Sequence, residues 1–128
     1  MAERLPAFES FIRELRAIWA AAPEDCVRME RSKPLLERFV MDASTKSHSA
    51  SWPSTEGRKN LRLCVDADYG FVINAVVRMP GRRGSVHDHA DAWVLYGVLD
   101  GQESLERYDR IDDGLTPGYA EVRLSSVT

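Results

Sequence analysis

The chain has 128 residues, a length that suits one domain with a single hydrophobic core and is too short for two. Hydrophobic residues make up 44% of it and charged residues 29%, the balance of an ordinary soluble globular protein. The formal net charge is −3 and the arginines are scattered among acidic residues, so no basic stripe that could follow phosphates is visible. We therefore predict that nucleic acid is not a partner.

The two cysteines, Cys26 and Cys64, are too few for a disulfide scaffold and too far apart in the sequence for a chelating pair. The most apolar stretch near the N-terminus, "AIWAAAP", is short and follows several charged residues. It therefore predicts neither a signal peptide nor a membrane span. Together these observations predict a cytoplasmic protein with reduced thiols and no membrane partner.

Residues 1–44 are predicted to form a helical N-terminal extension. Apolar residues recur there at spacings of three and four, which predicts an amphipathic helix that Pro23 ends. The residues of this stripe are Leu5, Phe8, Ile12, Leu15, Trp19 and Ala22. A second helix is predicted from Ser32 as its N-cap and Pro34 in its first turn, followed by an apolar stripe of Leu35, Leu36, Phe39 and Val40. By default both apolar stripes face a core.

The remainder, residues 45–128, is predicted to be the β domain. Residues 42–60 are small and polar and are predicted to form a loop, with His48 as a solvated loop histidine. From residue 61 the pattern becomes that of short strands separated by Gly, Pro and Asp. The runs are "LRLCVD", "FVINAVVRM", "SVHDHADAWVLYGVL", "ESLERYDRI" and "YAEVRLSSV". Several short strands at regular spacing predict an antiparallel β-barrel or sandwich, so the fold class is mainly β.

The stretch "GSVHDHADAWVLYGVLDGQE", residues 84–103, holds two of the three histidines of the chain. Side chains alternate between the two faces of a strand, so His87 and His89 would lie on the same face and could both reach one metal ion. Burying two imidazoles without a ligand would require hydrogen bonds for four ring nitrogens, which is costly in an apolar barrel. The alternative is two histidines on an exposed strand face, since a bare His-x-His is a weak motif.

The residues around this pair have the spacing of a known motif. They are Pro80, Gly81 and Gly84, then His87-Asp88-His89, then Gly97 and Gly101. This run resembles the first motif of the cupin superfamily, and "HDH" followed by an aromatic residue and "YGVLDGQE" resembles most the branch of the thiol dioxygenases, including cysteine dioxygenase. The resemblance implies a double-stranded β-helix, preceded by helices, that binds a metal through His87 and His89.

The same resemblance implies an activity. A non-haem Fe(II) enzyme of this branch would oxidise a small thiol carboxylate to a sulfinate with O₂, and another divalent metal is the alternative. Arg62 lies about where such enzymes hold the substrate carboxylate with a bidentate arginine, and Arg58 is the second candidate. A surface arginine on an edge strand explains Arg62 equally well.

Two positions depart from the common cupin pattern. Trp93 stands four residues after His89, where many cupins have a glutamate, so the resemblance implies the three-histidine branch. Val94 stands where animal cysteine dioxygenases have the cysteine of a Cys-Tyr crosslink, so that crosslink is not expected. Cys64 is then predicted to be a small buried residue, and Trp93 and Tyr96 to be core or pocket-wall residues.

The third histidine of such a site would follow in a second motif, and the chain stops at Thr128. We therefore expect a barrel that is truncated at its C-terminus or completed by another chain, with an open sheet edge through which a homo-oligomer could form. Two other functions stay open at this point. One is a cupin that binds a metal or a small ligand without catalysis, and the other is an inactive fragment.

Overall fold

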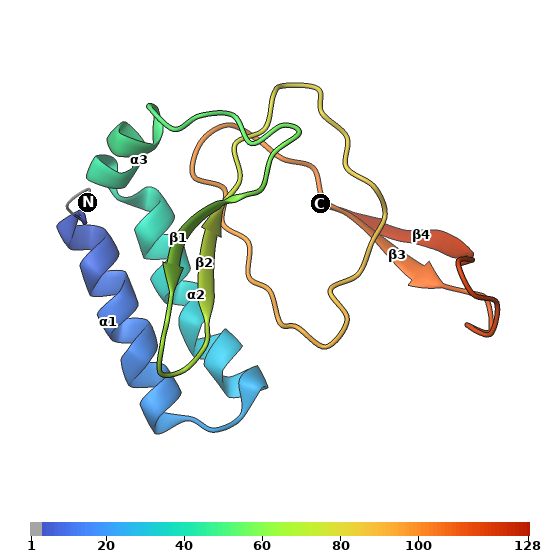
Figure 1. The fold of residues 1–128 in the computed structure, drawn as a ribbon, viewed down its shortest axis with the longest axis horizontal. Helices are drawn as coiled ribbons and strands as arrows, with labels where there is room; N and C mark the ends of the chain where they lie inside the picture. Colours follow the sequence, from blue (N-terminus) through green and yellow to red (C-terminus); the bar gives the residue numbers. More distant parts are fainter. Residues whose placement is uncertain (1–3) are drawn as a thin grey trace.

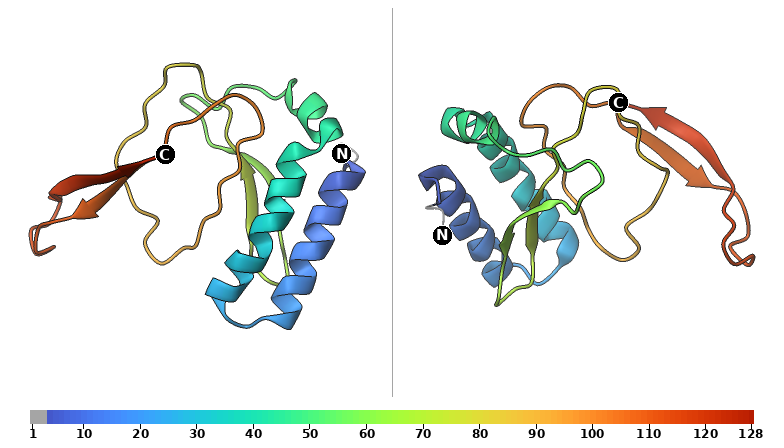
Figure 2. Two further views of the ribbon diagram at one scale, coloured as in Figure 1. Left: turned by 180° about the vertical axis from the view of Figure 1, so that it is seen from behind. Right: turned by 45° about the horizontal axis from the view of Figure 1, so that its top comes forward.

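A computed structural model describes residues 4–128 (Figure 1). The elements in chain order are α1 (Pro6–Ala21), α2 (Asp25–Met41), α3 (Ala43–Ser49), β1 (Leu61–Val65), β2 (Val72–Ala75), β3 (Glu106–Arg110) and β4 (Val122–Val127). The helices lie on one side of the molecule with the β1–β2 hairpin beside them, and the β3–β4 hairpin projects away at the other side (Figures 1 and 2). No helix within residues 4–128 is long and apolar enough to cross a membrane.

The prediction of a mainly β cupin barrel is wrong. Helix accounts for 32% of the described residues and strand for 16%, and the strands form two separate two-stranded antiparallel sheets rather than a closed barrel. The difference arises between residues 76 and 105, where the β-rich runs form an extended loop without strand pairing. A run with high β-propensity becomes a strand only where another strand supplies ladder hydrogen bonds, and none does so here.

The core lies between the helices. Phe11, Ile12 and Leu15 of α1 are buried, and Phe11 stacks on Phe39 of α2 with ring centroids 4.8 Å apart. Phe8 meets the same ring at 5.6 Å. The predicted helix is confirmed, including its end before Pro23, and Ile12 and Leu15 of its stripe are buried as expected. Phe11 was not among the predicted stripe residues.

The second helix was predicted too short. It begins at Asp25, so Ser32 and Pro34 lie inside it rather than at its start. Ser32 is only 2% exposed, and its hydroxyl donates to the carbonyl of Arg28, 2.6 Å away, one turn earlier. Packing of the whole helix against α1 therefore outweighs the local signals of a helix start.

The predicted loop at residues 42–60 contains a third helix. Asp42 is its N-cap, and its carboxylate accepts a hydrogen bond from the backbone N–H of Thr45 at 2.8 Å. Thr45 is 2% exposed, so this short helix is fixed at its start. His48 therefore lies on α3, where its exposed ring meets the ring of Trp52 edge-on.

An ionic contact fixes the β1–β2 hairpin to α1. Arg16 donates to the carboxylates of Asp66 and, at 2.6 Å, Asp68, which follow β1. Asp66 is 6% exposed and also accepts the backbone N–H groups of Tyr69 at 2.8 Å and Asp68 at 3.2 Å. Burial acts to raise the pKa of Asp66, but the hydrogen bonds from Tyr69 and Arg16 outweigh it and lower the pKa below the ordinary value of 3.8.

Stability is expected to fall in acid partly because of this contact. Since the pKa of Asp66 is lower in the folded state, its carboxylate contributes stability above pH 3.8 that is lost as the pH falls through the folded-state value. Asp66→Asn cannot ionise, so its free energy of unfolding should decrease less than that of the wild type between about pH 5 and pH 2. Urea titrations across this range measure the difference, with Asp91→Asn in an exposed loop as the control. Equal decreases in the wild type and Asp66→Asn would contradict the assignment.

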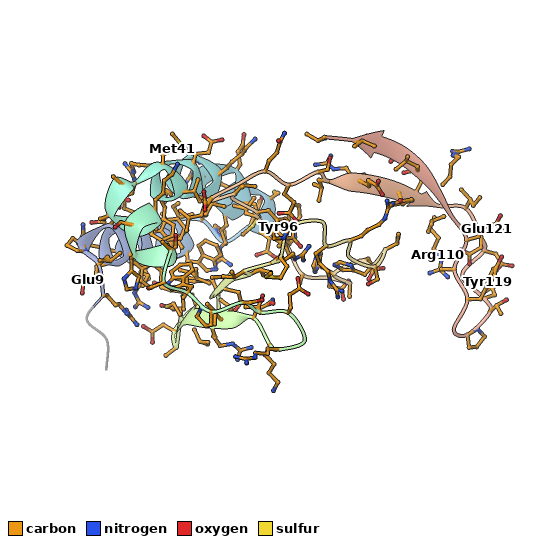
Figure 3. The ribbon with its side chains drawn as sticks, turned by 90° about the horizontal axis from the view of Figure 1, so that it is seen from above. Glu9, Met41, Tyr96, Arg110, Tyr119 and Glu121 are labelled. Atoms are coloured by element: carbon orange, nitrogen blue, oxygen red, sulfur yellow. The ribbon has the colours of Figure 1, made fainter. Side chains whose placement is uncertain are left out.

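The β3–β4 hairpin makes no contact with the other helices and strands of the described chain. Its strands pair antiparallel from Glu106↔Val127 to Arg110↔Val122. The register shifts opposite Arg107 and Tyr108, so Ser125 is an extra residue in β4 and forms a β-bulge. Thus the hairpin is a separate two-stranded unit that projects from the rest of the molecule (Figures 1 and 3).

Candidate functional site

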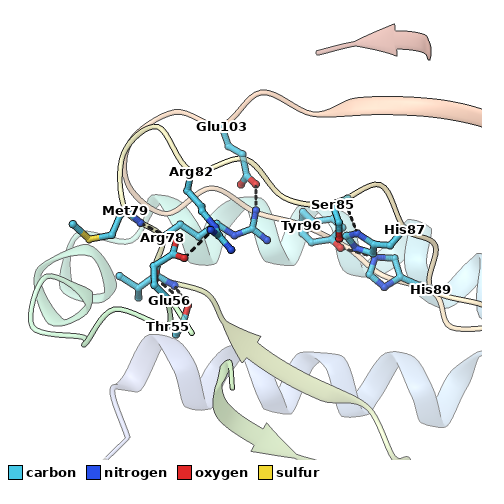
Figure 4. A network of polar contacts seen from close by, with 11 residues as sticks. Thr55, Glu56, Arg78, Met79, Arg82, Ser85, His87, His89, Tyr96 and Glu103 are labelled. Carbon is cyan, nitrogen blue, oxygen red and sulfur yellow. Dashed lines mark hydrogen bonds and ion pairs between the residues drawn. The ribbon is translucent and has the colours of Figure 1, made fainter. Parts of the chain in front are cut away.

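His87 and His89 face each other at a turn of the long loop (Figure 4). Their ring centroids are 5.1 Å apart and the ring planes are nearly perpendicular, at 84°. The turn is stabilised by Asp88, whose carboxylate accepts the N–H of Ala90 at 3.2 Å, and Ala90 has a φ of 52°. The predicted strand is therefore wrong, since residues 84–98 form a loop, whereas the two rings are close together as the spacing of His87 and His89 predicted.

The two rings lie in the open. Both histidines are exposed, and neither lines the two cavities described below. The two imidazoles are therefore not buried in an apolar barrel, and their exposure agrees with the alternative that the sequence left open. What remains of the prediction is the close pairing of the two imidazoles.

His87 has a defined tautomer. Its Nδ1 lies 2.8 Å from the carbonyl oxygen of Ser85, which can only accept, so Nδ1 carries the hydrogen. In the neutral ring Nε2 then holds a free lone pair. Histidines that bind metals commonly donate their other ring N–H to a carbonyl in this way, which fixes the ring and makes it a better ligand.

Tyr96 contacts the second histidine. Its hydroxyl lies 2.7 Å from Nε2 of His89, which leaves Nδ1 of that ring without a contact among the described residues. Tyr96 is 62% exposed and Trp93 is 58% exposed, so neither is the core or pocket-wall residue that the sequence predicted. Nothing in the local pattern indicated that Tyr96 folds back onto His89.

The separation of the two rings is compatible with their being two ligands of one divalent ion. A histidine nitrogen lies about 2.1 Å from such an ion, so two rings that share one have centroids roughly 5 Å apart, as here. Within residues 4–128 no group of three or more His, Cys, Asp or Glu residues is arranged to hold a metal. His87 and His89 could therefore supply part of a coordination shell whose other positions are open.

A basic cavity of about 260 Å³ reaches Ser85, two residues before His87. Figure 4 shows three of its lining side chains, Glu56, Arg78 and Arg82, in the same region as the pair. The lining of the cavity includes Arg58, Arg78, Arg82, Glu56, Asn60 and Ser85. Glu56 pairs with Arg82 at 3.1 Å, and Arg78 pairs at 3.4 Å with Glu103. Ser85 connects the two features, because it lines the cavity and its carbonyl orients His87. Two of the three lining arginines are thus paired with carboxylates, and Arg58, which forms no salt bridge among the described residues, is the guanidinium that could bind a small anion through paired hydrogen bonds.

The structure places the two candidate arginines differently. Arg58 lines this basic cavity, whereas Arg62 is exposed on β1 opposite Asn74 and lines neither cavity. Cys64 is 9% exposed, which confirms its prediction as a small buried residue. Arg78 and Arg82 were missed, since nothing in their local sequence connects them with Arg58.

A larger cavity, of about 630 Å³, lies between the helices and carries no such chemistry. Its lining consists of apolar and charged side chains, most of them from α1 and α2. Two of the charged ones, Glu14 and Arg38, neutralise each other in a salt bridge of 2.6 Å. The cavity holds no cysteine or histidine. It is therefore separate from the candidate site.

No family model matches the chain, and no solved structure matches it significantly. A functional assignment therefore rests on the residues of the site itself.

Proposed function

We propose that His87 and His89 bind a divalent metal, with Fe(II) as the first choice, and that the protein oxidises a small thiol carboxylate with O₂. The observation that carries the proposal is the arrangement around Ser85, where a pair of imidazoles 5.1 Å apart adjoins an arginine-lined cavity. The resemblance of the histidine stretch to thiol dioxygenases supports the choice of reaction. A closed barrel is no part of the proposal.

Each residue has a defined part in it. The Ser85 carbonyl holds His87 with Nε2 as the free nitrogen, and the Tyr96 hydroxyl orients His89. Arg58 would bind the substrate carboxylate in the basic cavity, so that the rest of a short substrate extends toward the histidines. Bound iron would lower the pKa of a coordinating thiol and activate O₂. Overall, RSH + O₂ gives RSO₂H, with both oxygen atoms ending on the sulfur.

A second function is favoured by the exposure of the rings. Two imidazoles hold a divalent ion less firmly than three protein ligands, and both rings here are open to solvent. A protein that binds a metal and a small carboxylate without catalysis would need no more than this. Metal binding without O₂ consumption would therefore favour a ligand-binding role.

The histidines are tested first by metal binding alone. Titration calorimetry with Fe(II) under anaerobic conditions, and with Co²⁺, should show one site that His87→Ala and His89→Ala each weaken at least roughly tenfold. The matched control is His48→Ala, which removes the third histidine on α3 and should leave the affinity unchanged. Equal affinity in the wild type and the His87→Ala/His89→Ala double variant would refute the metal site.

The arginines are tested by activity. Iron-loaded protein with cysteine or 3-mercaptopropionate should consume O₂ and form the sulfinate. Arg58→Ala should raise the KM for thiol carboxylates by roughly tenfold or more, because a charged hydrogen-bond pair to the carboxylate is lost. Arg62→Ala tests the arginine that the sequence suggested for the same role. If Arg62→Ala raises the KM more than Arg58→Ala does, the basic cavity does not hold the substrate. No uptake with either thiol, despite metal binding, would support the ligand-binding role.

A further inference from the structure

Strand β3 has one free edge. The backbone of Leu105 exchanges hydrogen bonds with Thr128, at 2.9 and 2.8 Å, and the N–H of Ile111 donates to Glu121 at 2.8 Å. Because backbone groups alternate along a strand, the odd-numbered residues of β3 face β4 and Glu106, Tyr108 and Arg110 face outward. No backbone hydrogen bond joins these three residues to any segment beyond the hairpin in residues 4–128.

We propose that two copies of the chain pair through this edge, with one β3 antiparallel to the other and the two-fold axis at Tyr108. The outward groups fit this register, because Glu106, Tyr108 and Arg110 would oppose Arg110, Tyr108 and Glu106 of the second copy. Each of these pairs can exchange two backbone hydrogen bonds. The result is a four-stranded sheet, which is more stable than an isolated two-stranded hairpin.

The charges of β3 are complementary to themselves in this register. Its sequence is Glu-Arg-Tyr-Asp-Arg, so a two-fold axis at the tyrosine places every charged residue opposite one of the other sign. On one face Glu106 meets Arg110, and on the other Arg107 meets Asp109, each pair occurring twice. Opposite charges directly across an antiparallel ladder stabilise it, and like charges destabilise it. A register shifted by one residue in either direction loses this match.

The other edge of the hairpin is less suited to pairing. β4 contains the bulge at Ser125, which interrupts its regular ladder, whereas β3 has no extra residue. Bulges at sheet edges commonly prevent further pairing. Apolar side chains of the hairpin also stay largely in solvent, since Leu105, Ile111 and Leu124 are 42%, 48% and 50% exposed. A second copy is thus the occupant that both the edge and the charges favour.

Contacts within one chain do not block this edge. Arg83 pairs with Glu106 at 2.8 Å, and the Tyr108 hydroxyl donates to the same carboxylate. Arg110 pairs with Asp112 at 2.7 Å. These are side-chain contacts, so the outward backbone groups stay available. Arg107 and Asp109 form no salt bridge among the described residues, and they are the pair on which the test is built.

The test uses charge reversal in sedimentation velocity over a concentration series up to about 1 mM, a range that covers weak edge-to-edge association. Wild type should show a concentration-dependent dimer. In the dimer, Arg107 of each copy lies opposite Asp109 of the other. Arg107→Glu therefore places two carboxylates opposite each other at both positions, and Asp109→Arg places two guanidinium groups opposite each other. Each variant should therefore weaken dimerisation at least about tenfold. An equimolar mixture of the two should dimerise like the wild type, because both cross-strand pairs are again opposite in charge.

Two controls separate the edge from general effects. Arg31→Glu makes the same change of charge on the exposed face of α2 and should leave the dimer unchanged. Asp109 also lies opposite Arg123 in β4, so Asp109→Arg could disturb the hairpin itself. Thermal unfolding checks that this variant is folded, and if it is unfolded, Arg107→Glu alone tests the dimer. A strictly monomeric wild type, or an Arg107→Glu variant that dimerises like the wild type, overturns the proposal.

Discussion

Phe11→Ala is expected to lower the free energy of unfolding by about 3–5 kcal/mol, the usual cost of truncating a buried phenylalanine. Phe11 is 7% exposed and stacks on Phe39, with ring centroids 4.8 Å apart. Few side chains of the described chain are buried as deeply, so the α1–α2 contact has little apolar surface to spare. The lost ring also leaves a cavity between the two helices, which neighbouring side chains can fill only in part.

Chemical denaturation followed by circular dichroism measures this change. Met41→Ala is the control, because Met41 lies at the end of α2, is 71% exposed, and should cost less than about 0.5 kcal/mol. If the wild type is less stable than the expected loss, Phe11→Ala will lack a cooperative transition while Met41→Ala retains one. A loss below about 1 kcal/mol for Phe11→Ala would show that the helix contact is not the main core.

The parts of the fold that were predicted from sequence are those fixed by local spacing. The stripe of α1 and the β1 run depend on periods of a few residues, and both are present. The missing barrel depended on pairing between distant segments, which a β-rich run does not specify. Residues 84–98 have the composition of a strand but no partner strand, so they form a loop.

Of the candidate site, the histidine pair was predicted from the sequence and the basic cavity was not. The closeness of His87 and His89 was predicted from strand alternation, and the two rings are close, but in a loop and not in a strand. The basic cavity was not predicted, because Arg58 meets Arg78 only through the folded path of the chain. A local pattern identifies residue types capable of chemistry, whereas their assembly depends on long-range contacts.

Gly97→Ala is expected to disturb the candidate site from a distance. The loop passes so close to α2 at this point that a Cβ on Gly97 would lie 2.8 Å from Cγ1 of Val40 and 3.1 Å from Cγ of Leu36. Val40 is β-branched and stiff at χ1, so it cannot turn away freely. Overpacking of this kind costs about 1–3 kcal/mol, through a shift of the helix or of the loop.

The loop is the part expected to move, because it has no ladder hydrogen bonds while α2 is held by α1. Tyr96 is the neighbour of Gly97 and orients His89 at 2.7 Å, so Gly97→Ala should weaken metal binding as well as stability. Val40→Ala makes room for the added methyl, so the double variant Gly97→Ala/Val40→Ala should lose less stability than the sum of the two single variants. The Co²⁺ affinity of the double variant should likewise return toward that of Val40→Ala alone. If the losses of the two single variants simply add in both measurements, Gly97 does not pack on α2. If the double variant recovers stability but not Co²⁺ affinity, the contact of Gly97 with α2 does not influence the histidine pair.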